Sequence, residues 1–171
     1  MKRLIVPIVV LIGAGAIATS ASTPPASSAP AGNAVVKVFA PRGGPGASCA
    51  QVLPLARRVT KPAVLTGAMR ALVAGPTASE RTRGYGGWFS ARTADSVRSV
   101  RISHEVAYVD FRDFSRLIPN ASSSCGSTML LAQLDRTATQ FPSVKRTVYS
   151  FNGSRRAFYE WLQRAQPVVP R

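Results

Sequence analysis

The chain has few of the residues on which metal sites and most enzyme sites depend. Its 171 residues include one histidine, His104, two cysteines and only seven acidic residues. Metal ions are held by clusters of histidine, cysteine or carboxylate ligands at characteristic spacings, and Asp110 and Asp113 alone do not form such a cluster. We therefore expect neither a metal nor a cofactor. The two carboxylates are expected to form surface ion pairs with the nearby Arg112 and Arg116.

Catalytic motifs are missing as well. Proton transfer or nucleophilic attack would need His104 together with an orienting carboxylate and a serine. The sequence has no Gly-x-Ser-x-Gly segment, and His104 falls at an expected turn. Three glycines, Gly43, Gly44 and Gly46, lack the following lysine and serine or threonine of a phosphate-binding loop, so we interpret them as part of a turn. The sequence predicts a protein that is not an enzyme.

The sequence contains one long apolar run, residues 4–18, which follows a basic start. This run is shorter than the roughly 20 apolar residues of a membrane-spanning helix, and its layout is that of a secretory signal peptide with cleavage near Ala18 or Ala21. We expect residues 1–21 to be removed, which leaves a secreted or extracytoplasmic protein with no stable transmembrane span. An uncleaved segment would instead keep the protein associated with the membrane.

The rest of the chain divides by composition. Residues 22–33 are dominated by serine, threonine, proline, alanine and glycine, which cannot bury enough apolar surface to offset chain entropy. They are expected to form a disordered linker. Residues 34–166 are long enough for one domain with a single core, and residues 167–171 form a short tail.

Cys49 and Cys125 are the only cysteines. In an oxidising compartment, an even number of cysteines in a small domain predicts a disulfide. The closed loop is long, so the chain-entropy model allows about 4 kcal/mol of stabilisation. The alternative, two reduced thiols for metal binding or catalysis, lacks neighbouring ligands.

Charge is the strongest compositional signal. Lysine and arginine number 22 against seven acidic residues, a net charge of +15. Such a chain is attracted to polyanions, so binding of teichoic or nucleic acid is an alternative function. The arginines are scattered rather than massed in one block, however, and a GC-rich genome would also enrich arginine and alanine.

Hydrophobic periodicity predicts an α+β domain, with a mixed or antiparallel sheet and helices packed on one face. The expected order is strand 34–41, strand 51–60, helix 62–74, hairpin strands 97–103 and 106–111, helix 127–141, strand 144–151, and a last helix capped by Ser154. Pro54 places the second strand at a sheet edge, and Thr60 could cap the first helix.

Two details of this assignment matter below. The helix at 127–141 is expected to bury one stripe of apolar residues: Leu131, Leu134, Ala138 and Phe141. The hairpin turn would consist of His104 and Glu105, which are poor residues for a tight turn because such turns favour asparagine and glycine. The turn type therefore stays open.

The polar segment 77–93 is the longest expected loop. It contains the candidate ligand-binding residues, in which aromatic and guanidinium groups could contact sugars or phosphates: Arg81, Arg83, Tyr85, Trp88 and Arg92. The alternative is that Tyr85 and Trp88 pack at the edge of the core.

Several segments together resemble the GerMN domain, a module named from spore germination and sporulation proteins. They are the extended residues 35–41, LVAGPTASE at 72–80, SVRSVRISHEVAYVDF at 96–111, and LAQLDRTATQFPSVKRTVYSFNG at 131–153. The family usually has an Asp-Gly or Asn-Gly turn before the VAYVDF-like strand, where this chain has His104 and Glu105. Cys49 and Cys125 also look like additions to the family pattern.

The resemblance implies a noncatalytic, extracytoplasmic domain that binds or scaffolds in the cell envelope. It carries over no catalytic residue and names no ligand. We therefore expect an exported binding or scaffolding module whose partner is an envelope protein or a glycan.

Overall fold

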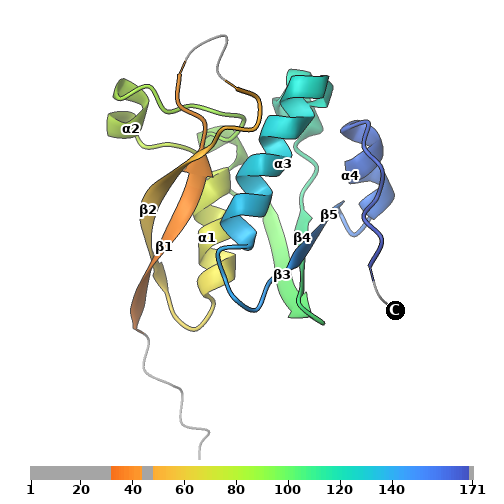
Figure 1. Ribbon diagram of the computed structural model, residues 1–171, viewed down its shortest axis with the longest axis horizontal. Coiled ribbons are helices and arrows are strands. Elements are labelled where there is room, and N and C mark those ends of the chain that lie inside the picture. The colour runs from red at the N-terminus through yellow and green to blue at the C-terminus, as the bar shows by residue number, and fades with distance from the viewer. Residues whose placement is uncertain (1–31, 44–47, 170–171) are drawn as a thin grey trace, which may run out of the picture. The chain divides into compact units, whose positions relative to one another are not determined.

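The computed structural model describes residues 32–43 and 48–169 (Figure 1). The expected signal peptide, most of the expected linker, Gly44, Gly46 and the end of the tail lie outside these residues. Strand β1 (Asn33–Ala40) takes in the last residue of the expected linker.

Strands β1 and β2 (Leu53–Thr60) form a two-stranded antiparallel sheet. β-branched and aromatic residues favour the extended conformation of β1, and Val36 and Val38 are buried on it. Pro54 lies opposite Phe39 in the register. Because β2 has β1 as its only strand partner among the described residues, the predicted edge position of the proline-containing strand is confirmed.

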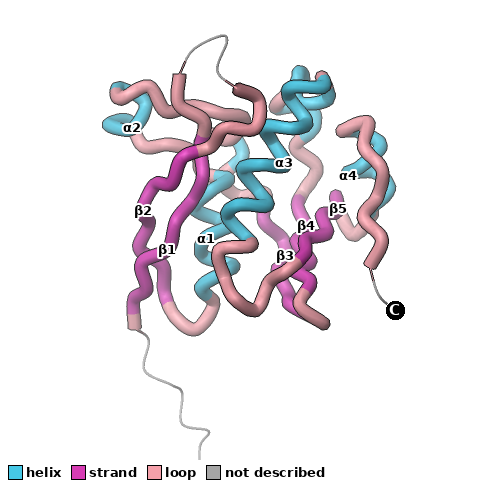
Figure 2. The backbone as a smooth tube through the Cα atoms, viewed as in Figure 1, coloured by secondary structure: helices cyan, strands magenta, loops and turns pink. Residues whose placement is uncertain are grey.

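The second sheet has three strands in the order β3 (Val97–Ser103), β4 (Val106–Phe111) and β5 (Arg146–Phe151). β3 and β4 are antiparallel, and β4 and β5 are parallel. The α+β class and the mixed sheet are confirmed. The expectation of one sheet is wrong, because helices lie between β1–β2 and this mixed sheet and keep them apart (Figure 2).

The helices connect the two sheets. α1 (Val64–Val73) contacts β1, β2 and β3, and α3 (Ser124–Ala138) contacts β1 and β5. α4 (Arg155–Trp161) packs on β5. The short α2 (Ala78–Thr82) replaces part of the loop expected at 77–93. None of the helices within the described residues has the length and apolar character needed to span a bilayer.

The ends of α1 and α3 differ from the prediction. Ala63, not Thr60, is the N-cap of α1 and makes no side-chain cap. α3 begins at Ser124, three residues before the expected start, because the Ser123 hydroxyl accepts the Gly126 N–H at 3.1 Å. It ends at Ala138, three residues before Phe141.

The buried stripe of α3 is also shifted. Leu134 and Ala138 are buried as predicted, but Leu130 takes the buried place expected for Leu131. Leu131 and Phe141 are only partly buried against the core. The residue at which α3 begins does not decide which of its side chains are buried. The buried side of α3 follows from its contacts with β1 of one sheet and β5 of the other.

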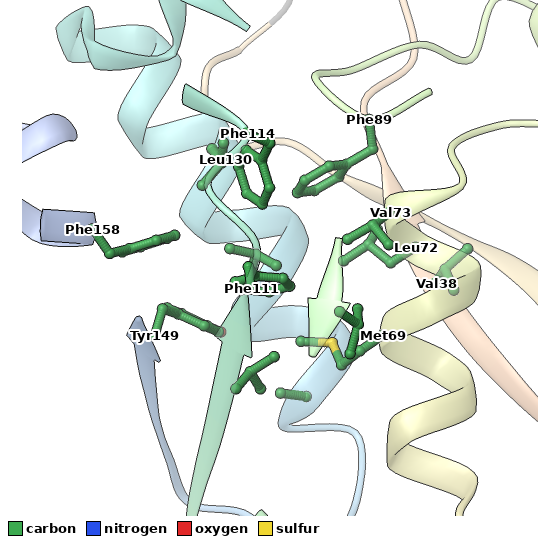
Figure 3. Packing of buried hydrophobic residues seen from close by; sticks show 14 of the residues in the cluster. Val38, Met69, Leu72, Val73, Phe89, Phe111, Phe114, Leu130, Tyr149 and Phe158 are labelled. Atoms are coloured by element: carbon green, nitrogen blue, oxygen red, sulfur yellow. The ribbon is translucent and has the colours of Figure 1, made fainter. Parts of the chain in front are cut away.

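The core lies between the sheets and under α4 (Figure 3). Its largest fully buried side chains come from β4, β5, α1, α3, α4 and the loop after β4, and include Tyr149, Phe111, Phe114, Phe158, Met69, Leu72 and Leu130. Phe111, Phe114, Phe151 and Phe158 stack edge to face or in parallel at centroid distances of 4.9–6.3 Å. Aromatic pairs at such distances contribute beyond their buried area.

Polar side chains at the end of α3 and just after it cover the outer edge of β1. Gln140 accepts the Lys37 N–H at 2.8 Å and donates to the Lys37 carbonyl at 2.6 Å, as a neighbouring strand would. One turn earlier, the Thr137 hydroxyl accepts the Phe39 N–H at 3.2 Å. Thr137 is fully buried, so its burial is explained by the strand edge that it closes.

The GPTASE segment has a structural role. Thr77 accepts the Glu80 N–H and Glu80 accepts the Thr77 N–H, which is a capping box at the start of α2. Arg57 of β2 donates to both carboxylate oxygens of Glu80 at 2.7 and 2.6 Å, and this guanidinium lowers the pKa of Glu80 to about 2. These motif residues therefore fasten α2 to β2.

Two tight turns next to strands of the mixed sheet use positive φ. The predicted hairpin is confirmed, and its turn has His104 at φ 48° and Glu105 at φ 58°, the left-handed pair of a type I′ turn. The turn after β5 has Asn152 at 49° and Gly153 at 85°. The hairpin thus adopts the strained conformation without the residues that normally allow it.

Candidate binding site

The outer face of the mixed sheet carries the candidate site. Strand alternation sends Val109 and Phe111 of β4 into the core and leaves Tyr108 and Asp110 on the opposite face. The register places Arg101 beside Tyr108 and Ser99 beside Asp110 on β3. It places Val148 and Ser150 beside the same two residues on β5. The buried residues of α4, Phe158 and Tyr159, pack on the core side, and its first residue, Arg155, reaches the outer face.

Tyr108 is held between two arginines. The Arg101 guanidinium lies 3.9 Å from the centroid of its ring, and the Arg155 guanidinium lies 5.2 Å from it. Both distances are within the range of cation–π attraction. Neither arginine forms an ion pair in the described part of the chain, so their N–H donors are available to a ligand.

Asp110 is fixed from three sides. It accepts from Arg98 at 2.9 Å, from the Ser150 hydroxyl at 2.7 Å and from the Gly153 N–H at 2.7 Å. The aspartate of the VAYVDF segment therefore anchors the Asn-Gly turn that precedes α4. Because Arg155 follows that turn directly, Asp110 also positions one of the two free guanidinium groups.

These residues line an open hollow of about 240 Å³. Val148, which is only 2% exposed, contributes apolar surface to it, and Ser99 and Ser150 contribute hydroxyl groups. Guanidinium groups form strong hydrogen bonds with carboxylate and phosphate oxygens. The site is thus suited to hold an anionic group through noncovalent contacts.

The site offers no set of groups for proton transfer. His104 is exposed at the hairpin turn, where its Nδ1 lies 3.1 Å from the Ser103 hydroxyl. No carboxylate among the described residues hydrogen-bonds to this histidine. Within residues 32–43 and 48–169, no group of three or more histidine, cysteine, aspartate or glutamate side chains is arranged to hold a metal ion.

The prediction that Asp110 and Asp113 form ion pairs with Arg112 and Arg116 is wrong. Asp110 pairs with Arg98, across the strand pair, instead of with Arg112 or Arg116. Asp113 accepts the Ser115 N–H at 2.8 Å and so closes a local turn. Arg112 lies just beyond the end of β4, and its guanidinium donates to the Asp95 carbonyl at 3.2 Å instead.

The candidate loop residues of segment 77–93 do not share one hollow. Arg83 and Arg92 are exposed, and Arg92 lines a separate hollow of about 220 Å³ together with Asp95 and Arg112. Arg81 donates to the Pro76 carbonyl, within the segment itself. The structure therefore disperses the arginines that the sequence places close together.

The two aromatic residues of this segment contact the protein itself. Tyr85 packs against the core and lies 5.5 Å from the Arg42 guanidinium. Trp88 is partly buried, and its indole N–H donates to the Gly126 carbonyl at 3.0 Å. Packing at the edge of the core accounts for both side chains.

The residues of the outer sheet face were not among the sequence-based candidates. The signal that could have found them is the alternation in segments 97–103 and 106–111, which puts Arg101, Tyr108 and Asp110 opposite the buried valines. Arg155 had no such signal, because its position depends on the fold of the Asn-Gly turn.

Two links fasten α3 to the rest of the domain. Cys49 and Cys125 form the predicted disulfide, with Cα atoms 5.0 Å apart, which ties the first turn of α3 to the β1–β2 connection. Asp135 accepts from the hydroxyls of Thr147 and Tyr149, each at 2.7 Å. Burial raises the pKa of Asp135, but this carboxyl lies on the core side, so we assign it a structural role.

The comparison with protein families decides the relationship. Residues 39–156 match the model of the Germane domain, described as "Sporulation and spore germination". The chain belongs to the Germane family. No curated protein matches the sequence. Residues 39–156 are thus a Germane domain.

A solved structure supports this at the level of the fold. The tandem GerMN domains of the sporulation protein GerM from Bacillus subtilis superimpose with a TM-score of 0.53 at 18% sequence identity. The match covers 78% of this chain and 43% of the GerM chain, so the chain spans less than half of that relative. The resemblance to the GerMN domain is confirmed.

Proposed function

We propose that this Germane domain is a noncatalytic, exported binding module of the cell envelope, and that it holds an envelope protein or glycan on the outer face of its mixed sheet. The observation that supports this is the pair of guanidinium groups, Arg101 and Arg155, set around Tyr108 without a carboxylate partner. A carboxylate or phosphate group of the partner would supply the negative charge that pairs with these two guanidinium groups.

The shape of the site favours a binding role over a reaction. Three donors already hold Asp110, so its role here is to position the turn that precedes α4. The serines of the hollow, Ser99 and Ser150, have no histidine near them. Recognition of a partner is the activity that these groups can support.

The test is a pull-down from envelope extract with the full chain, at low and at raised salt, with partners identified by mass spectrometry. Exposed ion pairs weaken as salt screens them, whereas a shaped site with apolar contact retains its partner. We expect one defined protein or glycan to remain at high salt. Loss of every partner at high salt would contradict the proposal.

A pair of double variants identifies the surface. R101A/R155A removes both guanidinium groups and is expected to release the partner. R83A/R92A removes the same charge from the segment 77–93, where both side chains are exposed, and is expected to retain it. If R83A/R92A releases the partner and R101A/R155A retains it, the binding site lies in segment 77–93 instead.

General binding of polyanions is the second candidate, because the described residues contain only three ion pairs in a chain with 22 basic residues. It predicts that teichoic or nucleic acid binds with a steep salt dependence. It also predicts that the two double variants weaken binding equally, since only total charge matters.

Export is tested separately. N-terminal sequencing of the protein from its native cells should begin near residue 19 or 22, and protease added outside the cytoplasmic membrane should digest it. A mature protein that begins at Met1 and resists the protease would contradict export.

A further inference from the structure

The outer edge of β3 is open. Ser103 and Val106 flank the two-residue turn, so they form a hydrogen-bonded pair, and such pairs alternate with non-bonded pairs along an antiparallel ladder. Val100 and Ile102 occupy the non-bonded positions. Their N–H and C=O groups therefore point away from β4, and β3 has no other strand partner in the part of the chain that the structure describes.

A mainly apolar groove of about 330 Å³ runs beside this edge, between β3 and the first turn of α1. Pro62 and Val64 form one wall, and Val100 and Ile102 form the other. Ile102 is 43% exposed, which is unusual for a large apolar side chain of this domain. An exposed apolar residue beside unpaired backbone groups is the arrangement to which a further strand can be added.

The outer edges of β1 and β5 lack this combination. Gln140 and Thr137 close the edge of β1, and the Tyr159 hydroxyl accepts the Tyr149 N–H of β5 at 3.2 Å. The described domain thus covers two strand edges with its own side chains and leaves β3 uncovered.

Charge decides what fits the open edge. Arg98 and Arg101 are exposed on β3, on the face opposite the groove, and Lys61 is exposed where the chain enters the groove wall. Pairing β3 with β3 of a second copy would bring these arginines together, and like charges on neighbouring strands are destabilising. Arg98 is paired with Asp110, whereas Arg101 has no ion pair among the described residues, so an added strand with acidic residues on that face would complement Arg101.

We infer that the open edge of β3 and the groove beside it bind an extended peptide segment of a partner protein, in which apolar and acidic residues alternate. The apolar side chains enter the groove beside Val64 and Ile102, and the acidic ones lie beside Arg98 and Arg101. This surface shares Arg101 with the hollow around Tyr108, but its apolar groove and its outward backbone groups at Val100 and Ile102 form a second contact that does not involve Tyr108 or Arg155.

The experiment uses the full chain, labelled for NMR, and a capped heptapeptide that alternates glutamate with valine. Strand addition should slow hydrogen exchange of the Val100 and Ile102 amides at least tenfold. A heptapeptide that alternates lysine with valine should bind at least tenfold more weakly. Equal binding of the two peptides, or protection confined to other amides, would overturn the inference.

Two substitutions at one position separate backbone from side chain. Ile102→Pro removes the outward N–H, which an edge strand tolerates, and should weaken the acidic peptide at least tenfold. Ile102→Ala keeps the N–H and should weaken it about threefold. Arg116→Ala removes a charge elsewhere on the exposed surface and should leave the affinity within twofold.

The remaining outcomes are also decisive. If Ile102→Pro binds the peptide as the wild type does, with an unchanged thermal unfolding curve, the edge is not the site. If the free chain forms a dimer in which the Val100 and Ile102 amides are already protected, the occupant is a second copy and the inference is wrong. The exchange measurement on the wild type does not depend on any variant folding.

Discussion

The outer strands β1 and β3 both pack beside α1, yet their free edges differ: one is hydrogen-bonded to side chains and the other is open. At β1, Thr137 of α3 and Gln140, which follows the helix, take the place of a neighbouring strand. At β3, the edge faces a groove and one side of the sheet faces solvent. The contrast suggests that side-chain hydrogen bonds secure the β1–β2 half of the domain, while the mixed sheet is left available for contacts.

The disulfide should make the largest contribution to that secured half. Cys49 and Cys125 hold the first turn of α3 against the β1–β2 connection, with a sequence separation of 76 residues. The double variant C49A/C125A is expected to lose about 4 kcal/mol in the free energy of unfolding, measured by urea denaturation. Reductant should destabilise the wild type and leave the double variant unchanged; equal stability of the two proteins without reductant would contradict the prediction.

Removal of the buried ion pair should come next. Glu80→Gln is expected to cost about 2 kcal/mol, because Arg57 is then left partly buried without its carboxylate. Glu160→Gln breaks the exposed pair with Arg156 and serves as the control, with little change expected. Comparable losses in the two variants, measured by thermal and urea unfolding, would contradict the assignment.

The same pair predicts a pH dependence. The pKa of Glu80 falls from 4.5 to about 2 on folding, so the folded state binds this proton less readily than the unfolded state does. Its stabilisation is present above pH 4.5 and is lost as the pH falls from there toward 2. Unfolding curves between pH 2 and 6 should show this loss in the wild type and a reduced loss in Glu80→Gln.

Opening the β1 edge tests the contrast directly. Thr137→Val keeps the shape of the side chain but leaves the buried Phe39 N–H without its acceptor, at a cost of about 2 kcal/mol. Thr139→Val changes an exposed threonine two residues further on and should be nearly neutral. If both variants unfold alike, side-chain closure of this edge is not what stabilises it.

The smallest expected effect concerns the hairpin of the open sheet. Replacing His104 with asparagine and Glu105 with glycine relieves left-handed backbone at both positions and should raise the unfolding free energy by about 1 kcal/mol. Gly153→Ala is the reciprocal change, since Gly153 has φ 85° and open space around it, and should lower stability. In thermal unfolding, the midpoint temperature should rise for His104→Asn/Glu105→Gly and fall for Gly153→Ala. A lower midpoint for His104→Asn/Glu105→Gly would contradict the strain argument.

Local pattern was enough for much of the fold but not for the site. Alternation in 97–103 and 106–111 predicted the hairpin, and hydrophobic periodicity predicted the helix at 62–74, which the structure has as α1. The loop residues Arg81 and Arg92, chosen because they are close in sequence, do not line the same hollow: Arg81 contacts the Pro76 carbonyl, and Arg92 lies beside Asp95. Residues of the outer sheet face come from three separate segments, which no local pattern brings together.

The sequence by itself determined the strand and helix order, the family and the cysteine pairing, because periodicity, motif order and the presence of only two cysteines are properties of the chain. The tertiary structure decided that there are two sheets and that Gln140 closes the edge at Lys37. It also decided that Arg57 pairs with Glu80, and that Arg101 and Arg155 meet at Tyr108. Periodicity tells which side of an element is buried, whereas contacts between distant polar groups depend on how the elements pack against one another.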